Sequence, residues 1–140
     1  MLKIKVKRLG ETRLPSYAHE GDAGMDFYST EDVVLKPGQR HAFATKIAME
    51  IPKGYVGLVW DKSGLSKNSG LKNLGGVVDS TYRGEVIITL VNLGQEEYHV
   101  KKGDKIAQML IQHVEHAAIE ESGELEGSVR GHSGFGSTGR

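Results

Sequence analysis

Short apolar runs separated by turn residues recur along the chain, and they restrict its fold more than any other feature of the sequence. From His41 to Ile51 the apolar residues follow a period of two, with Phe43, Ile47 and Met49 on one face. This spacing is typical of a β-strand, because successive side chains of a strand point to opposite faces. Turns rich in glycine and proline flank the segment. The pattern predicts an all-β sandwich, jelly roll or barrel.

Most other apolar runs also predict strands, and only one segment predicts a helix. Leu2, Ile4 and Val6 alternate with lysines, which predicts a half-buried strand. Val86–Val91 is continuously apolar, which predicts a strand buried on both faces. Residues 63–69 fit one or two helical turns, in which Ser63 could cap the helix, bind an anion, or do both. We expect further strands at 23–29, 33–35, 55–60, 77–78, 98–100 and 106–111.

The composition predicts one domain and excludes several classes of function. The 140 residues carry 18 basic and 18 acidic side chains, and this zero net charge argues against a general nucleic-acid or membrane-surface binder. The chain has no cysteine, which excludes disulfides and makes a zinc site improbable. An apolar content of 38% is low, so association with further chains would bury useful surface. With no signal-like or membrane-spanning run, we expect a cytoplasmic protein.

The stretch Gly75–Val86 combines turn glycines, a short apolar strand and polar residues. Asp79 directly follows the apolar pair Val77–Val78. An acid at a rigid strand end is well held for general-base chemistry, although an ordinary hairpin turn explains the same residues. Gly76 and Gly84 are expected in backbone conformations that residues with a β-carbon resist.

Three polar residues elsewhere are candidates for a site. Asp26 lies in the middle of an apolar strand and needs a partner or a metal, unless that strand is an edge strand with Asp26 in solvent. Lys62 follows a predicted strand and precedes short polar residues that can offer N–H groups to a phosphate. Gln108 interrupts the last apolar strand, and a buried amide requires hydrogen-bond partners, either structural or from a ligand.

The last segment of the chain changes character. An acidic connector begins at Glu115, and the chain ends in a Gly/Ser-rich tail. Such tails are usually disordered, but this one carries the parts of a phosphate clamp with a stacking ring. We expect a barrel domain at 1–127 and a flexible arm at 128–140. The candidate residues of the arm are Arg130, Phe135, Gly136, Ser137 and Thr138.

Taken in order, five segments resemble the five motifs of the trimeric dUTP nucleotidohydrolase (dUTPase) family. The resemblance spans nearly the whole chain, and five ordered motifs are far more specific than one. It implies a distorted jelly-roll-like β-barrel with one short helix and a flexible C-terminal arm, assembled as a homotrimer with shared active sites. It also implies Mg²⁺-dependent hydrolysis of dUTP to dUMP and pyrophosphate, which limits uracil in DNA and supplies dUMP for dTTP synthesis. The segments are 23–29, 61–66, 76–86, 103–110 and 130–139.

The resemblance also implies a role for each matching residue. Asp79 matches the acid that activates the water attacking the α-phosphate. Tyr82 matches the ring that packs on deoxyribose and excludes a 2′-hydroxyl. Asp26 matches an acid that helps to hold Mg²⁺, through water. The other matches bind substrate: Asn73, Val77, Val78 and Phe135 at the nucleoside, and Lys62, Ser63, Gly64, Gln108, Arg130, Ser137 and Thr138 at the phosphates, with Gly136 in the same tail motif.

The second motif departs from the usual Pro-Arg-Ser of the family. Here it reads Asp61-Lys62-Ser63, and lysine keeps the charge of arginine but loses its bidentate fork. Asp61 adds a negative charge near the expected triphosphate, which would weaken phosphate binding. Met25, Thr81 and His132 also differ from the common pattern.

Two other functions compete with this interpretation. A dCTP deaminase shares the fold, but that family places a carboxylate on the strand after the third motif and lacks this tail. Residues 86–92 contain no carboxylate. A non-enzymatic regulatory protein on the same scaffold is the second alternative, against which the complete set of catalytic residues argues.

Overall fold

A computed structural model describes residues 1–139 and confirms an all-β chain with one short helix, α1 (Ser63–Ser69). Strands β3 (Val33–Leu35), β5 (Tyr55–Trp60), β7 (Val77–Val78) and β9 (Tyr98–Val100) have the bounds that the apolar runs predict. The sequence did not predict β6 (Leu71–Leu74). The remaining strands are β1 (Lys5–Arg8), β2 (Met25–Tyr28), β4 (Arg40–Glu50), β8 (Glu85–Asn92) and β10 (Lys105–His113).

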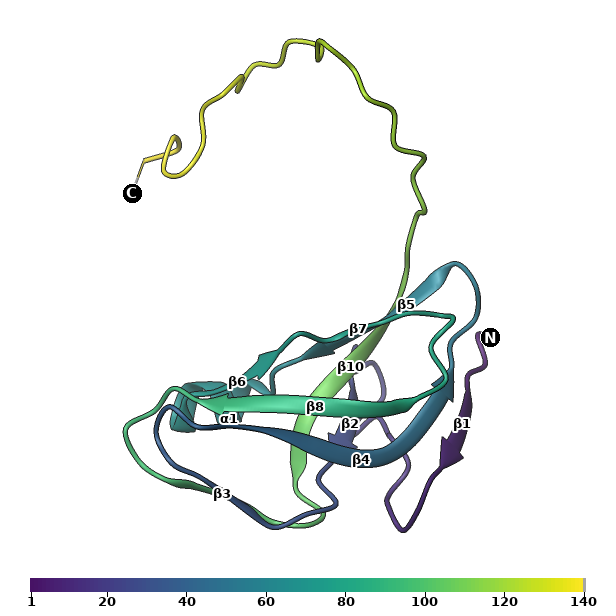
Figure 1. The fold of residues 1–140 in the computed structure, drawn as a ribbon, viewed down its shortest axis with the longest axis vertical. Helices are drawn as coiled ribbons and strands as arrows, with labels where there is room; N and C mark the ends of the chain where they lie inside the picture. Colours follow the sequence, from purple (N-terminus) through teal and green to yellow (C-terminus); the bar gives the residue numbers. More distant parts are fainter. Residues whose placement is uncertain (140) are drawn as a thin grey trace.

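The strands form two four-stranded antiparallel sheets and a smaller pair. One sheet has the order β1-β4-β8-β6, the other has the order β2-β10-β5-β7, and β3 pairs with β9. Figure 1 shows β4 and β8 running side by side across one wall while β10 crosses behind them. Strands far apart in sequence thus face one another, which gives an open, jelly-roll-like barrel as expected.

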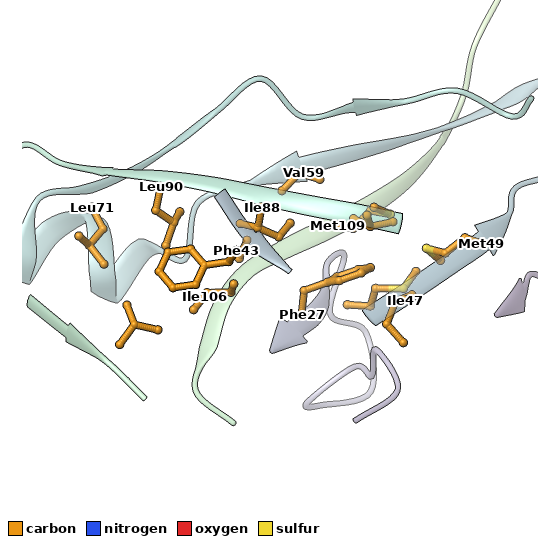
Figure 2. Close-up of a cluster of buried hydrophobic side chains, with 14 of the residues drawn as sticks. Phe27, Phe43, Ile47, Met49, Val59, Leu71, Ile88, Leu90, Ile106 and Met109 are labelled. Carbon is orange, nitrogen blue, oxygen red and sulfur yellow. The ribbon is translucent and has the colours of Figure 1, made fainter. Parts of the chain in front are cut away.

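A single core fills the space between the sheets (Figure 2). The apolar face of β4 points into it, with Phe43, Ile47 and Met49 all buried as the period of two predicts. Phe27 from β2 and Met109 from β10 meet them from the opposite sheet. The core therefore fixes β2 and β10 relative to β4, and these two strands carry the polar candidates Asp26 and Gln108.

Two strands differ from the burial that the sequence predicts. In β8, Val86, Ile88 and Leu90 are buried but Ile87 is exposed, so the prediction of burial on both faces is wrong. The four residues of β1 are all exposed, because β1 lies at the sheet edge, and only the preceding Ile4 packs on the core. In both strands an apolar side chain, Ile87 in β8 and Val6 in β1, is therefore exposed in the single chain.

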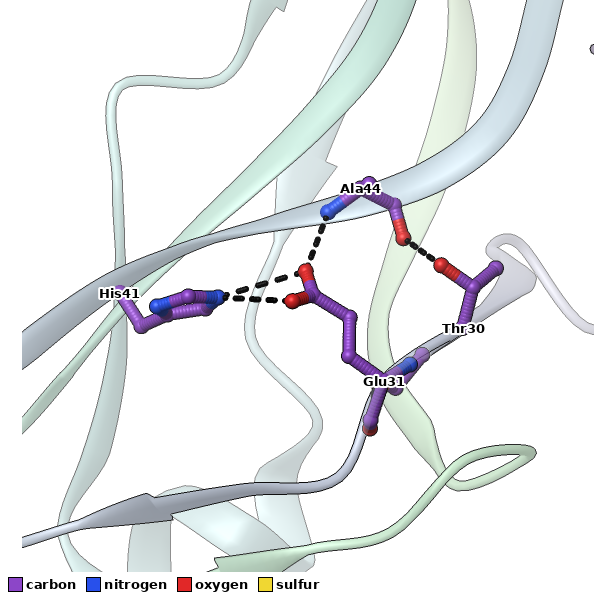
Figure 3. Close-up of polar contacts among 5 residues, drawn as sticks. Thr30, Glu31, His41 and Ala44 are labelled. Carbon is purple, nitrogen blue, oxygen red and sulfur yellow. Dashed lines mark hydrogen bonds and ion pairs between the residues drawn. The ribbon is translucent and has the colours of Figure 1, made fainter.

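The segment after β2 is held against β4 by side chains (Figure 3). The carboxylate of Glu31 accepts hydrogen bonds from the N–H of Ala44 at 3.0 Å and contacts Nε2 of His41 at 3.2 and 3.3 Å. The hydroxyl of Thr30 donates to the carbonyl of Ala44 at 2.7 Å. These bonds satisfy the backbone of β4 where no strand pairs with that edge, and they fix the exit of β2.

Helix α1 begins shortly after β5, and its N-cap residue differs from the predicted one. Lys62 is the N-cap residue, and no side chain caps the helix, so Ser63 is the first helical residue and not the cap. The hydroxyl of Ser63 is thus free of a capping role and is exposed. None of the helices within residues 1–139 is long and apolar enough to cross a bilayer.

The chain beyond β10 leaves the barrel as an extended arm (Figure 1). Within residues 1–139, no hydrogen bond or ion pair connects 117–139 to 1–113. The last backbone contact with the barrel is the N–H of Val114 donating to the carbonyl of Gly54 at 2.9 Å. The domain boundary at 127/128 stays a prediction, while Arg140 lies outside the described residues.

Candidate functional site

The first cluster of polar candidates is centred on Asp26, which is buried at 1% exposure. Its Oδ1 lies 2.6 Å from Nζ of Lys62, and its Oδ2 lies 2.8 Å from Nζ of Lys105. Asp26 is therefore not a solvent-exposed residue on an edge strand. A carboxylate this deep requires cationic partners, and the two lysines supply them.

Gln108 joins the same cluster from β10. In the strand register Gln108 pairs with Asp26 of β2 on one side and with Trp60 of β5 on the other. Its side-chain Nε2 donates to the carbonyl of Asp61 at 2.8 Å. The first, second and fourth predicted motifs thus meet at one end of the β2-β10-β5 sheet, where Lys62 and Gln108 are both partly exposed.

The structure assigns Asp61 a role that the sequence did not suggest. Its Oδ1 accepts a hydrogen bond from the backbone N–H of Asn73 at 2.5 Å, and its Oδ2 lies 2.7 Å from Nζ of Lys72. The carboxylate holds β6 against the end of β5 and is neutralised by a lysine of its own. We therefore expect Asp61 to oppose phosphate binding much less than its position in the sequence implies.

A second cluster surrounds β6 and β7. Asn73 is buried, and its Nδ2 donates to the carbonyls of Val59 and Gly75, each at 3.3 Å. Gly76 has φ of +115°, and a β-carbon there would lie 2.8 Å from the carbonyl oxygen of Val59. The predicted special conformation of Gly76 is confirmed, and close contact with β5 adds a second constraint.

Asp79 and Tyr82 follow β7 in a tight turn. The N–H of Tyr82 donates to the carbonyl of Asp79 at 3.1 Å, and the Tyr82 hydroxyl donates to the carbonyl of Glu85 at 2.8 Å. Gly84 does not have a positive φ, so its predicted turn conformation is wrong. Its lack of a side chain matters because a β-carbon would collide with the Tyr82 ring.

Asp79 is exposed and lines a groove of about 1240 Å³. Val77, Arg83, Tyr55 and His113 line the same groove, so it lies between the β7 turn and the ends of β5 and β10. The groove is open to solvent, and Lys62 and Gln108 do not line it. A carboxylate here can accept a proton from a water molecule, as a general base requires.

Asp79 and Lys62 lie toward opposite ends of β5, whereas Asn73 lies beside Val59 and Asp61, near the Lys62 end. Val78, next to Asp79, pairs with Gly57 near the start of the strand, whereas Lys62 lies two residues beyond its end. Five residues from Gly57 to Lys62, at about 3.3 Å each, place the two groups roughly 16 Å apart along the strand. One chain therefore does not bring the candidate base and the candidate phosphate-binding lysine together.

The predicted residues of the arm are present but make only local contacts. Nε of Arg130 donates to the carbonyl of Ser133 at 2.7 Å, and the Phe135 side chain is fully exposed. Phe135 has φ of +47° and Gly136 of +103°, so the arm turns sharply at the candidate stacking ring. Ser137 and Thr138 are also exposed. None of these groups reaches the barrel clusters.

Electrostatics of the Asp26 cluster favour its charged form. Burial raises the pKa of Asp26, but hydrogen bonds and charge from Lys105 and Lys62 outweigh that effect, and the pKa ends below its usual value. The hydrogen bond to Asp26 in turn raises the pKa of Lys105. The contact thus favours the charged forms of both Asp26 and Lys105.

Sequence reasoning missed Lys105. The residue precedes an apolar strand and reads as an ordinary surface lysine. Its proximity to Asp26 follows from the β2–β10 register, which pairs Lys105 with Tyr28 ahead of a shift in the ladder. Only the strand pairing, which the sequence does not contain locally, brings these residues together.

Comparison with known proteins agrees with these motifs. A family model described as dUTPase matches residues 11–139. The deoxyuridine 5'-triphosphate nucleotidohydrolases of Clostridium kluyveri and Zymomonas mobilis are each 47% identical to this chain. Each alignment covers 99% of this chain, together with 99% of the Clostridium protein and 98% of the Zymomonas protein. The dUTPase of Staphylococcus bacteriophage 80alpha with dUpNHpp has a TM-score of 0.94 and 31% identity, with both chains fully covered.

The chain therefore belongs to the dUTPase family. Membership makes it an enzyme, a dUTP diphosphatase, whose activity is the hydrolysis of dUTP.

Proposed function

We propose that the enzyme hydrolyses dUTP to dUMP and pyrophosphate by attack of a water molecule on the α-phosphorus, with Asp79 as the general base. The observation that carries this proposal is the placement of Asp79 at the end of β7, exposed to a groove and joined through the backbone to Tyr82. Asp79 takes a proton from the attacking water, the new P–O bond forms, and the bond to pyrophosphate breaks. The same turn would present Tyr82 to the sugar.

Nucleoside recognition is assigned to the β6–β7 cluster. Asn73 and the backbone of Val77 and Val78 would form the uracil pocket, in which the amide oxygen of Asn73 can accept from an N–H and backbone N–H groups can donate to a carbonyl. The Asn73 side chain is already ordered by the carbonyls of Val59 and Gly75, which limits its rotation before substrate binds. Tyr82 would pack on the deoxyribose and exclude a 2′-hydroxyl.

Phosphate recognition is assigned to the Asp26 end of the sheet and to the arm. Lys62, Ser63, Gly64 and Gln108 would contact the triphosphate through an ammonium group, a hydroxyl, a backbone N–H and an amide. The arm would then close, with Arg130, Ser137 and Thr138 at the terminal phosphates and Phe135 stacked on uracil. Closure excludes water and brings positive charge to the phosphates.

Mg²⁺ is the cofactor that we propose for this reaction. Residues 1–139 contain no cluster of three or more carboxylate, histidine or cysteine side chains for a metal. Mg²⁺ commonly keeps several waters and takes substrate phosphates as ligands, so the phosphates can hold it with little help. Both oxygens of Asp26 contact ammonium groups. If one lysine moved to a substrate phosphate, the freed carboxylate oxygen could contact the ion through a water molecule. When bound, the ion neutralises phosphate charge. A structural Mg(II) ion is described for the dUTPase of phage phi11. That protein is 29% identical to this chain with a TM-score of 0.83, and the match covers 88% of this chain and 98% of the phage protein.

A homotrimer with active sites shared between subunits is the assembly that we propose. The separation of about 16 Å along β5 supports it, because a triphosphate held at Lys62 would not reach Asp79 of the same chain. The outward-facing Ile87, Trp60 and Val77 support it too, since such apolar residues are suited to contacts between subunits. The arm would reach a site on a neighbouring subunit.

The variant Asp79→Asn tests the proposed mechanism. The amide has the size of the carboxylate but cannot accept the proton, so we expect kcat to fall by roughly 10²–10⁴-fold while dUpNHpp still binds. Pyrophosphate release from dUTP and ammonia release from dCTP are measured together, because the second product would reveal a deaminase. A near-native rate of dUTP hydrolysis by Asp79→Asn would remove Asp79 from the mechanism.

A further inference from the structure

Lys105 occupies a position equivalent to that of Lys62 on the other side of Asp26. Its Nζ lies 2.8 Å from Oδ2, while Nζ of Lys62 lies 2.6 Å from Oδ1 of the same carboxylate. The lysines come from different elements, since Lys105 starts β10 and Lys62 precedes α1. One carboxylate thus holds two ammonium groups close together.

Exposure separates the carboxylate from the two cations. The side chain of Asp26 is 1% exposed, whereas those of Lys62 and Lys105 are 29% and 45% exposed. An anion that approaches from solvent therefore meets the ammonium groups, with the carboxylate behind them. Two lysines against one aspartate leave one positive charge. Arg13 adds to it, because its guanidinium lies over the Tyr28 ring, 4.7 Å from the centroid, and its charge acts on Lys105. This arrangement suits a polyanion with neighbouring charges, such as a triphosphate.

The lysine at position 62 explains why such an arrangement is useful. A lysine is a point charge on a flexible stem, and it lacks the planar fork with which arginine grips a phosphate. Binding through a mobile lysine costs free energy, because the side chain must be ordered. A buried carboxylate that contacts both ammonium groups orders them before the substrate arrives.

We propose that Lys105 is a further phosphate-binding residue of the active site, and that Asp26 is a positioning residue that directs both Lys62 and Lys105 toward the triphosphate. The inference rests on the proposed function, because it concerns the same phosphate site. The alternative role for Asp26 is that its carboxylate competes with the triphosphate for the two lysines. Positioning and competition predict opposite changes in triphosphate affinity when the charge of Asp26 is removed.

The first test compares Lys105→Met with Lys102→Met in the full-length enzyme. Lys102 is the control, because it lies in the preceding turn and its Nζ contacts only the exposed Glu11, at 3.8 Å. Calorimetry measures the Kd of dUpNHpp and that of dUMP, which lacks the β- and γ-phosphates. We expect Lys105→Met to raise the Kd of dUpNHpp by about tenfold to a hundredfold, and to leave that of dUMP unchanged. We expect Lys102→Met to change neither, and Lys105→Arg to restore most of the affinity.

Two results would overturn the role of Lys105. An unchanged Kd of dUpNHpp in Lys105→Met would show that no phosphate contact is lost. Equal weakening of dUpNHpp and dUMP would show a general structural defect instead. Because Lys105 is at the surface, its replacement by methionine leaves the core intact, which circular dichroism verifies.

The second test uses Asp26→Asn, in which a neutral amide of similar size replaces the carboxylate. If Asp26 positions the lysines, the Kd of dUpNHpp rises by roughly tenfold, because two long side chains must now be ordered on binding. An unchanged or lower Kd would overturn the positioning role and favour competition. If Asp26→Asn does not fold, the Lys105 comparison still decides whether the cluster binds phosphate.

These outcomes are separable from those that concern the proposed function. Loss of activity in Asp79→Asn together with normal binding by Lys105→Met would keep the mechanism and reject the new residue. Full activity of Asp79→Asn with weaker dUpNHpp binding by Lys105→Met would reject the proposed base and keep the phosphate site.

Discussion

The ring of Tyr82 lies against Gly84, so closely that a β-carbon at position 84 would collide with the ring and its hydroxyl. The hydroxyl also donates to the carbonyl of Glu85, and the N–H donates to the carbonyl of Asp79. The tyrosine is therefore placed by its own turn and not by distant packing. The positions of the proposed base and the proposed sugar gate depend on the same few residues.

Gly84→Ala should weaken discrimination against UTP, although neither Asp79 nor Tyr82 is itself replaced. The new methyl group displaces the Tyr82 ring, and the ring can then no longer occlude a 2′-hydroxyl. We expect the ratio of kcat/KM for dUTP to that for UTP to fall by at least about tenfold, a loss of some 1.4 kcal/mol of discrimination. Gly123→Ala, where a β-carbon meets nothing, is the control. Equal ratios in Gly84→Ala and the unmodified enzyme would place the gate elsewhere.

Asp61→Asn should leave triphosphate affinity nearly unchanged. The carboxylate of Asp61 already contacts Lys72 and the N–H of Asn73, and the amide oxygen can keep the second bond. We expect the Kd of dUpNHpp to change by less than about threefold, and the free energy of unfolding to fall by about 1 kcal/mol through the lost ion pair. Titration calorimetry and urea unfolding measure the two quantities. A tenfold gain in affinity would show that the Asp61 charge does oppose the phosphates.

The Asp26 cluster should make the enzyme sensitive to acid. Because the pKa of Asp26 is lowered in the folded chain, its stabilising effect is complete above the ordinary value of 3.8 and is lost as pH falls through the folded value. Below pH 3.8 the stability advantage of the unmodified enzyme over Asp26→Asn should shrink by about 1.4 kcal/mol per pH unit. Urea unfolding between about pH 2.5 and 5, at fixed protein concentration, measures this difference.

A matched variant separates this effect from general loss of negative charge. Asp22→Asn removes a carboxylate from the exposed loop, where Asp22 only accepts a hydrogen bond from the N–H of His19 and contacts its ring. It supplies the background change across the same pH range. A constant difference between the unmodified enzyme and Asp26→Asn from pH 5 to pH 2.5 would contradict the lowered pKa.

Truncation after Gly127 should leave assembly intact and remove most of the activity. The strands end at His113, and residues 117–139 make no polar contact with 1–113 in the described chain. Losing the phosphate and stacking groups of the arm together should lower kcat/KM by at least about 10²-fold. Light scattering and steady-state kinetics on dUTP measure the two outcomes.

Mixing the truncated chain with intact-tailed Asp79→Asn tests whether the arm acts between subunits. If an arm closes over a site whose Asp79 belongs to another chain, mixed assemblies recover part of the activity. If each arm serves the Asp79 of its own chain, activity stays at the level of the two separate variants even though subunit exchange is verified by mass spectrometry.

Much of the fold follows from local patterns, and the differences arise where a strand's surroundings matter. The period of two in β4 and the short runs of β3, β5, β7 and β9 predict those strands, because each alternation or turn is complete within the segment. Ile87 and Val6 face outward on one chain, although their sequences predict burial. A strand's sequence records which residues are apolar, but not whether the covering surface belongs to the same chain.

The candidate site shows the same division. Asp26, Gln108 and Asp79 stand out in sequence because a polar residue inside or beside an apolar run needs a reason. Strand pairing between distant segments brings their partners close. Lys105 contacts Asp26, and the carbonyl of Asp61 accepts a hydrogen bond from Gln108. Register between such strands depends on the whole core, so no local signal could have revealed these contacts.

The close contact of Gly76 with Val59 limits how this enzyme can change over time. A β-carbon at position 76 would lie 2.8 Å from the Val59 carbonyl oxygen and 3.0 Å from Nδ2 of Asn73, in a backbone conformation that L side chains rarely adopt. This part of the proposed nucleoside pocket is therefore built from main chain, which point mutation cannot reshape by adding a larger side chain. Evolution or laboratory selection toward another base would have to work through the exposed neighbour Val77 or by remodelling the whole β6–β7 loop.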